Sequence, residues 1–195
     1  MIDSTARHYV EPIISWTAKK FHKGGLNPNH VTWFAFLIGS SSGVLIYKNN
    51  FWWAIVVLWI SGFLDAVDGS MARQNEQTTA WGTLLDITFD RIVEISYIIG
   101  LALCFPASRL YLIFMCGSII LSMTIFLSVG TLSRKKGKKT FYYQAGLVER
   151  TEGFILFSLM LIFVEHVSLL AIIYTGAVLV TALQRMLEAR KILGN

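Results

Sequence analysis

Four aspartates lie in or beside strongly apolar stretches of the sequence: Asp65, Asp68, Asp86 and Asp90. Asp65 and Asp68 are three positions apart and Asp86 and Asp90 are four apart, so each pair shares one face of a helix. Ionised carboxylates at membrane depth are costly and normally face a cavity, a partner or an ion. If two antiparallel helices joined by the polar segment 74–79 carry the two pairs, the carboxylates converge and repel one another. This arrangement predicts one or two bound divalent metal ions.

The ligand type narrows the choice of metal. Carboxylate oxygens suit hard cations such as Mg²⁺, Mn²⁺ or Ca²⁺, and the sequence offers no cluster of His and Cys for zinc. Mg²⁺ usually completes its coordination shell with waters and substrate phosphates, which predicts a phosphate-handling site. Gly69 and Gly82 would let a phosphate or a neighbouring helix approach closely. Small residues at helix contacts are the alternative for both, and for Gly82 this alternative explains the residue almost as well. Arg73 could hold a phosphate oxygen or could only flank a membrane span.

The elements that must position these residues are apolar helices. The chain has 195 residues, of which 54% are apolar and 15% charged, with a mean hydropathy of +0.57. These values predict an all-α polytopic membrane protein with one domain over residues 1–195. Residues 2–23 predict an amphipathic helix lying in the membrane interface, with a disordered basic tail as the alternative. Six apolar stretches predict transmembrane helices at about 30–47, 51–71, 81–105, 109–132, 153–164 and 167–183.

The basic residues predict the orientation of these spans. With six spans, one side of the membrane receives most of the Lys and Arg residues, and the other receives only Lys48 and Arg109. This bias predicts a multi-pass protein of the cell membrane with both termini and the aspartates on the cytoplasmic side. The net charge of +5 is concentrated beside the spans, where it orients the protein and attracts lipid phosphate, so no nucleic-acid partner is expected.

The pattern Asp65-x2-Asp68-Gly69-x2-Ala72-Arg73-x8-Gly82-x3-Asp86-x3-Asp90 resembles, without a departure, the signature of the CDP-alcohol phosphotransferase family of membrane enzymes. The sequence NPNHVT at 27–32 resembles the Pro-Asn-x-x-Thr start of the first span in that family. The resemblance implies an enzyme that transfers a substituted phosphate from a CDP-linked lipid, such as CDP-diacylglycerol, to an alcohol hydroxyl and releases CMP. It also implies a homodimer with a site open to both the cytosol and the bilayer.

The resemblance also implies roles for individual residues. Asp65, Asp68 and Asp86 would hold two Mg²⁺ or Mn²⁺ ions, and Asp90 would contact the second ion and act as general base. For Asp90, a role as one more metal ligand stays open. Contacts to the cytidine diphosphate are implied for Asn29, Thr32, Gly69, Arg73 and Thr79.

Other functional classes also put carboxylates inside spans. A secondary transporter or a proton pathway would do so, but neither gives a reason for the spacing of the glycines and Arg73. A non-catalytic lipid-binding protein would not need all four aspartates. Metal-dependent release of CMP separates the enzyme from these alternatives.

The alcohol acceptor is predicted from basic residues near the fifth span. The sequence Glu149-Arg150-Thr151-Glu152 resembles an element of family members that make phosphatidylinositol phosphate or the related archaeal ether lipid, in which the arginine contacts the acceptor phosphate. The segment VGTLSRKKG at 129–137 departs from the basic run that those members carry upstream. Arg150 and Arg134 are the candidate acceptor ligands, and Arg150 could instead pair with Glu149 and Glu152. Inositol phosphate is the first candidate acceptor, ahead of glycerol 3-phosphate, serine and other alcohols.

Overall fold

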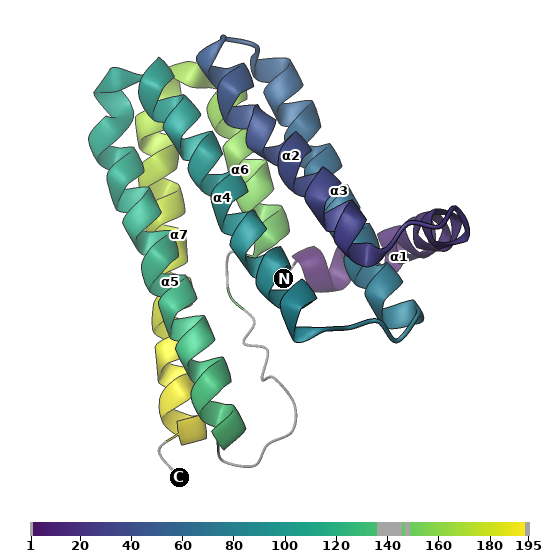
Figure 1. The fold of residues 1–195 in the computed structure, drawn as a ribbon. Coiled ribbons are helices and arrows are strands. Elements are labelled where there is room, and N and C mark those ends of the chain that lie inside the picture. The colour runs from purple at the N-terminus through teal and green to yellow at the C-terminus, as the bar shows by residue number, and fades with distance from the viewer. Residues whose placement is uncertain (1, 136–145, 147–148, 194–195) are drawn as a thin grey trace. The chain divides into compact units, whose positions relative to one another are not determined.

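The computed structural model of the protein describes the backbone of residues 2–135, 146 and 149–193, and the side chains of 10–132, 146, 149–191 and 193. This part of the chain is helical and contains no strand, as predicted. It divides into two compact units, Ser4–Pro106 and Ala107–Asn195 with Met1–Asp3. The first unit contains α1 (Ile2–Lys23), α2 (Pro28–Tyr47), α3 (Phe51–Gln74) and α4 (Ala80–Cys104) (Figure 1). The second contains α5 (Arg109–Lys135), α6 (Arg150–Ile162) and α7 (Val167–Leu193), with short 3-10 turns at Pro106–Ser108 and Val164–His166.

Each of the six predicted spans is a helix, α2 to α7. By length and composition, four segments can cross a membrane: Pro28–Tyr47, Phe51–Gln74, Pro106–Leu132 and Val164–Lys191. α4 is long enough, but every 18-residue window of it contains the charged residues Asp90, Arg91 and Glu94. α6 has 13 residues and is about 20 Å long, which is shorter than a hydrocarbon core of about 30 Å. The helical character of all six segments is confirmed, and four qualify as spans on their own sequence.

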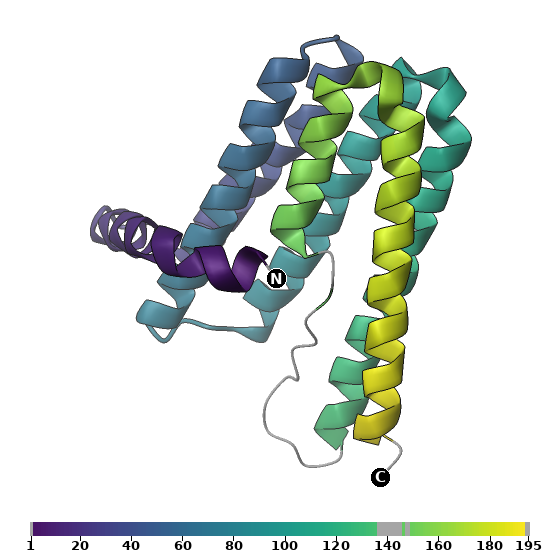
Figure 2. The same ribbon diagram turned by 180° about the vertical axis from the view of Figure 1, so that it is seen from behind.

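In the first unit, α2 packs against both α3 and α4 through small residues (Figures 1 and 2). Two serines join the helices: Ser61 Oγ of α3 donates to the Ala35 carbonyl oxygen at 2.8 Å, and Ser96 Oγ of α4 donates to the Ser40 carbonyl oxygen at 2.7 Å. A Cβ atom on Gly43 would collide with the carbonyl oxygen of Ser96. Glycine at this position is therefore a condition for the close approach of α2 and α4.

α1 runs across the ends of α2 and α3 rather than alongside them, as both ribbon views show. Its buried residues Ile14 and Ala18 join a core cluster with Val31 of α2 and Val67 and Met71 of α3. The predicted helix at 2–23 is confirmed, and Pro12 lies inside it. The apolar contact fixes α1 against the part of the unit where the aspartates lie.

In the second unit, α5 and α7 lie side by side and run in the same direction, while α6 runs opposite to them. Ser108 and Ser168 are hydrogen-bonded at 2.9 Å where α5 and α7 begin, and the rings of Phe157 and Tyr174 stack at 5.4 Å between α6 and α7. α7 continues to Leu193, beyond the predicted end of its span at Leu183. The extension is a run of good helix formers and charged residues, which the apolar pattern did not include.

Candidate active site and metal centre

The described residues contain a cluster of carboxylates formed by Asp65, Asp68 and Asp86. Each residue offers an oxygen, and these ligand atoms all lie within 4.8 Å of one another. Asp68 is buried, and Asp65 and Asp86 are half-buried. The predicted convergence of α3 and α4 therefore brings three of the four aspartates together. Three carboxylate oxygens at this separation form a donor set that suits a hard divalent cation.

Asp90 lies one turn beyond Asp86 on α4 and is half-buried, but it is not part of the group of three. Its neighbour Arg91 forms an ion pair with Glu94, with 2.5 Å between Nη1 and Oε2. Arg91 therefore directs its charge along α4 to Glu94. Asp90 lies on the same helix as Asp86, four positions further along.

A cavity of about 170 Å³ adjoins the carboxylate cluster and is formed entirely within the first unit. α2, α3, α4 and the 74–79 connection all contribute to it. Its lining includes all five residues expected to contact a cytidine diphosphate: Asn29, Thr32, Gly69, Arg73 and Thr79. It also includes five polar or acidic residues, Asp68, Gln77, Thr78, Thr83 and Asp86. Among these, Gln77, Thr78 and Thr83 were not predicted, because their spacing matches no pattern.

Two glycines keep this cavity open. A Cβ atom on Gly69 would lie 3.2 Å from Nη1 of Arg73, so a side chain there would crowd the guanidinium. A Cβ atom on Gly82 would lie 3.2 Å from Thr79 Oγ1 and 3.3 Å from Asn29 Oδ1. All three distances are tighter than ordinary contacts, so glycine allows the polar side chains of the cavity to approach the helix backbones. At both positions the neighbouring atoms belong to polar side chains that line the cavity.

Helix starts position the remaining polar groups. Asn27 is the N-cap of α2 and Pro28 its first residue, a common way to begin a helix. Thr79 is the N-cap of α4, and its Oγ1 accepts a hydrogen bond from the Gly82 amide at 3.0 Å. Two helix N-termini therefore border the same cavity, and their partial positive charge favours an anionic ligand.

The predicted acceptor ligands belong to the second unit. Arg150 is the first residue of α6, and its guanidinium lies over the ring of Phe154 at 5.5 Å. Glu149 and Glu152 form a capping box, in which Glu152 Oε2 accepts a hydrogen bond from the Glu149 amide at 3.2 Å. These carboxylates thus serve to start α6. Arg134 lies in α5, but its side chain is outside the described residues, as is most of the basic segment that follows it.

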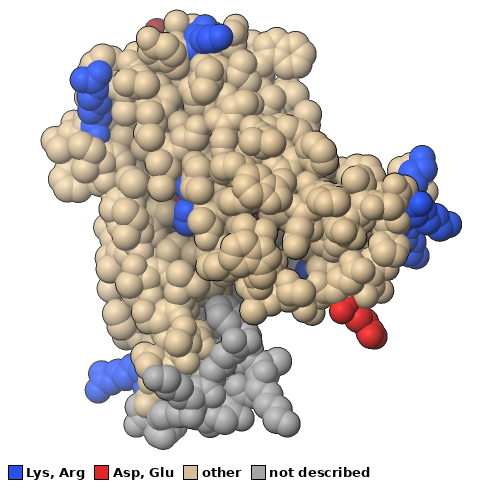
Figure 3. All heavy atoms as spheres, in the orientation of Figure 1, with Lys and Arg blue, Asp and Glu red and all other residues tan. Residues whose placement is uncertain are grey.

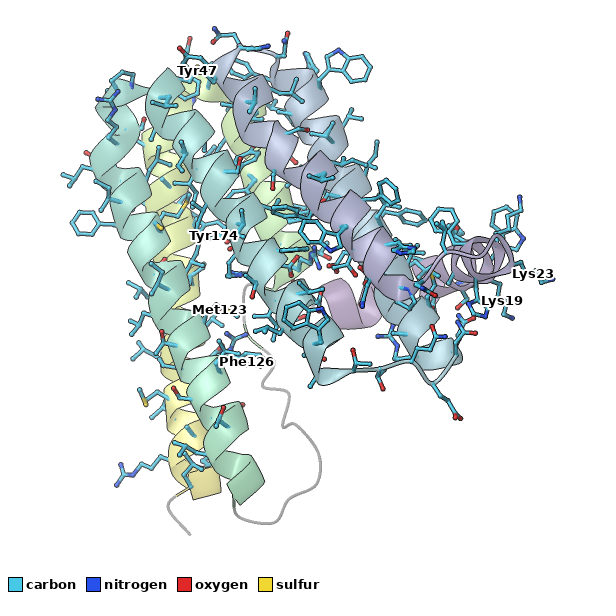
Figure 4. All side chains as sticks on the ribbon, in the orientation of Figure 1. Lys19, Lys23, Tyr47, Met123, Phe126 and Tyr174 are labelled. Atoms are coloured by element: carbon cyan, nitrogen blue, oxygen red, sulfur yellow. The ribbon has the colours of Figure 1, made fainter. Side chains whose placement is uncertain are left out.

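Arg185 of α7 is a further interior arginine that the sequence patterns did not single out. Its Nη1 donates to Ser122 Oγ of α5 at 3.0 Å, and its guanidinium lies over the Phe126 ring at 4.9 Å. Figure 4 labels Phe126 on α5. The predicted span ends at Leu183, which places Arg185 outside it among the basic residues that flank the spans. The run of good helix formers after Leu183, which continues the helix through Arg185, is the sequence signal that could have identified it.

Sequence comparison identifies relatives of this chain. A sequence model of the CDP-alcohol phosphatidyltransferase family matches residues 26–184. The phosphatidylinositol phosphate synthase of Streptomyces avermitilis is 32% identical over 108 residues, which are 53% of this chain and 43% of that protein. Inner membrane protein YnjF of Escherichia coli is 29% identical over 174 residues, which are 84% of this chain and 82% of that protein. The match to the Streptomyces protein thus spans less than half of its length.

Structure comparison identifies the same fold in a solved protein. The phosphatidylinositol phosphate synthase of Mycobacterium tuberculosis, crystallised with CDP-DAG bound, superimposes with a TM-score of 0.72 at 20% sequence identity. The match covers 92% of this chain and 94% of that one. A second crystal structure of that protein, in complex with manganese and citrate, gives a TM-score of 0.71. At this level of identity the likeness concerns the fold.

Proposed function

Because the chain belongs to the CDP-alcohol phosphatidyltransferase family, we propose that it transfers a phosphatidyl group from CDP-diacylglycerol to an alcohol hydroxyl and releases CMP. The observation that carries this proposal is the cavity in the first unit. It joins two members of the carboxylate cluster, Asp68 and Asp86, to the residues expected to bind a nucleotide diphosphate. A site for anionic phosphate beside a site for divalent metal is what this chemistry needs.

Asp65, Asp68 and Asp86 would hold Mg²⁺ or Mn²⁺, with Asp90 contacting a second ion. Bound divalent ions would neutralise charge on the diphosphate and on the CMP leaving group. The close placement of three carboxylates supports one such ion directly. The proposal of two ions rests on Asp90, which lies on the same helix one turn further along.

The chain's own residues would bind and orient the donor. Arg73 and the N-termini of α2 and α4 border the cavity, where they would hold the diphosphate oxygens. Asn29, Thr32 and Thr79 would contact the nucleotide. Asp90 would accept the proton of the acceptor hydroxyl as its oxygen bonds to phosphorus and the bond from phosphorus to the CMP oxygen breaks.

The acceptor is proposed to be inositol phosphate. The Streptomyces and Mycobacterium proteins are named phosphatidylinositol phosphate synthases. In the second unit, the side chains of Arg150 and Arg185 could bind a phosphate. Arg134 remains a candidate for the same role. Glycerol 3-phosphate, serine and other alcohols are the alternative acceptors.

We also propose six membrane spans, α2 to α7, in a single catalytic domain. The family match at 26–184 extends across both units, which supports one domain. The charged residues that exclude α4 by composition include Asp90, a residue of the proposed site. The half-buried capping box of Glu149 and Glu152 supports α6 as the start of a span. The distribution of Lys and Arg supports a cytoplasmic site and cytoplasmic termini in the cell membrane. The homodimer that the family resemblance implies is part of the same proposal.

The test is an assay of CMP release by the purified protein in lipid nanodiscs. The protein would receive CDP-diacylglycerol, Mg²⁺ and, in separate reactions, inositol phosphate, glycerol 3-phosphate, serine or no acceptor. We expect CMP to form fastest with inositol phosphate and the lipid product to contain phosphorylated inositol. No CMP with any acceptor would contradict the proposed chemistry, and faster CMP release with another alcohol would correct the acceptor alone.

A further inference from the structure

α1 has a buried apolar face and an open apolar face. Its buried face consists of Ile14 and Ala18, which are 8% and 1% exposed. Its open apolar face consists of Val10, Ile13 and Trp16, which are 41%, 59% and 59% exposed. An isolated water-soluble unit would gain nothing from leaving these three side chains uncovered. The open face therefore needs an apolar surrounding that the first unit does not itself supply.

The end of α1 is basic. Lys19, Lys20 and Lys23 are all exposed, and Figure 3 shows Lys and Arg side chains gathered at this end of the helix. Figure 4 labels Lys19 and Lys23 there. Lys20 Nζ lies 4.2 Å from the ring centroid of Trp16, so one lysine is held directly beside the open apolar face. Among the side chains described in α1, Glu11 is the one acid, and it is half-buried.

Apolar side chains next to a row of lysines match the surface of an anionic bilayer. The apolar face would enter the boundary between headgroups and acyl chains while the lysines meet lipid phosphates. Each lysine near such a surface raises the affinity for an anionic membrane about fivefold. The short turn at 24–27 ties α1 to α2, a helix long enough to span the membrane, so α1 is kept at the bilayer surface. This basic and apolar surface is named here the α1 surface: Val10, Ile13, Trp16, Lys19, Lys20 and Lys23.

The opposite, buried face of α1 reaches the donor site. Ile14 and Ala18 share a core cluster with Val31, Val67 and Met71. Each of these three residues directly precedes a residue that lines the donor cavity, namely Thr32, Asp68 and Ala72. A change in how α1 sits would therefore act on the backbone next to the cavity through a single layer of packed side chains.

We propose that the α1 surface binds anionic lipid headgroups and that this contact holds the donor cavity in the geometry that binds the CDP-lipid. The effect of lipid binding on donor affinity rests on the proposed function, whereas lipid binding by α1 does not. The consequence is an enzyme whose donor affinity depends on the surface charge of its own membrane.

The experiment uses the full-length protein in nanodiscs of phosphatidylcholine with increasing phosphatidylglycerol, at a fixed surface fraction of CDP-diacylglycerol. In the wild type, we expect the donor KM to fall about threefold to tenfold as phosphatidylglycerol increases. In the K19Q/K20Q/K23Q variant, the donor KM should stay at its high value in every membrane. The matched control is R190Q/K191Q, which removes exposed basic residues from the last turn of α7 and should respond like the wild type.

A second measurement needs no activity. Backbone hydrogen exchange of residues 10–23, measured without substrate, should slow in the wild type as phosphatidylglycerol increases and should not change in the triple variant. Trp16→Ala should reduce this protection, while Trp52→Ala, which removes an exposed tryptophan at the start of α3, should not.

The two measurements separate the possible failures. If the wild type releases no CMP but α1 is still protected by phosphatidylglycerol, the proposed function fails and lipid binding by α1 stands. Equal protection of α1 in neutral and anionic nanodiscs would overturn the binding claim. A donor KM that responds equally in the wild type and the triple variant would overturn the coupling.

Discussion

The two units of the chain carry the proposed reaction in different ways. In the first unit, the carboxylate cluster and the cavity proposed to bind the CDP-lipid donor come from one short stretch, 65–86, together with the start of α2. In the second unit, the basic residues that could bind an acceptor lie far apart in sequence, at Arg150 and Arg185, and are held by different partners. In the proposed function, the residues of the chemistry thus lie close together in sequence, while the acceptor would be recognised by residues from separate helices. Such a division would let the acceptor change without disturbing the metal site.

Replacement of Asp68 tests the first unit with the largest expected effect. Asp68 is the buried member of the carboxylate cluster, so Asp68→Asn should remove most of the metal-dependent stabilisation of the transition state. A loss of several kcal/mol corresponds to a fall in turnover of roughly a thousandfold or more. The measurement is CMP release at saturating substrates. Glu76→Gln, which neutralises an exposed acid in the nearby connection, is the matched control and should keep near-normal turnover.

Replacement of Asp90 tests whether donor binding and removal of the acceptor proton depend on different residues. Asp90→Asn should lower turnover by about a hundredfold to a thousandfold, because the group that takes the acceptor proton is gone. CDP-lipid binding should survive, because Asp65, Asp68 and Asp86 remain together. Turnover and equilibrium binding of the donor would be measured on the same preparation. Near-normal turnover in this variant would remove Asp90 as the base.

The arginines of the second unit test acceptor recognition. Arg150→Ala and Arg185→Ala should each raise the KM of the acceptor about tenfold to a hundredfold, since each removes a charge-assisted contact of about 1.5 to 3 kcal/mol. The donor KM should stay near normal. Titration of acceptor at saturating donor, followed by the reverse titration, measures both constants.

A neighbouring residue supplies the control for Arg150. Glu149→Gln weakens the cap of α6, so it should lower the free energy of unfolding by about 1 kcal/mol. The acceptor KM should not change. If Arg150→Ala also lowers the stability and leaves the acceptor KM unchanged, the arginine has a structural role. The proposal of inositol phosphate as the acceptor then loses its main support.

Gly43 tests the scaffold of the first unit with the smallest expected effect. A side chain at this position collides with the backbone of α4, so Gly43→Val should reduce the free energy of unfolding by about 1 to 3 kcal/mol. Gly117→Ala in α5, where a Cβ atom meets nothing within 4 Å, should be neutral or slightly stabilising. Thermal unfolding in detergent compares the two variants. Equal stability of both would mean that the close approach of α2 and α4 does not hold the first unit together.

The contrast between the units also explains what the sequence could predict. Asp65 and Asp68 share one face of α3, and Asp86 lies on α4 after a short turn. Helical periodicity together with the packing of both helices against α2 places the three side chains together. Arg185 depends on Ser122, which is 63 positions away on a parallel helix, and no local pattern reports such a contact. Arg150 was singled out by its flanking glutamates, and the structure uses these as a helix cap. The glutamates therefore have a structural role in starting α6, and the role of Arg150 toward the acceptor stays a prediction.

Removal and return of metal tests the central claim most directly. CMP release from CDP-diacylglycerol would be measured with the wild-type protein after thorough chelation, then after adding back Mg²⁺ or Mn²⁺, with Asp86→Asn treated in parallel. The carboxylate cluster formed by Asp65, Asp68 and Asp86 predicts that chelation abolishes CMP release. Either ion should restore CMP release in the wild type, and neither ion should restore it in the variant. Undiminished CMP release by the chelated wild type would contradict the metal-dependent mechanism.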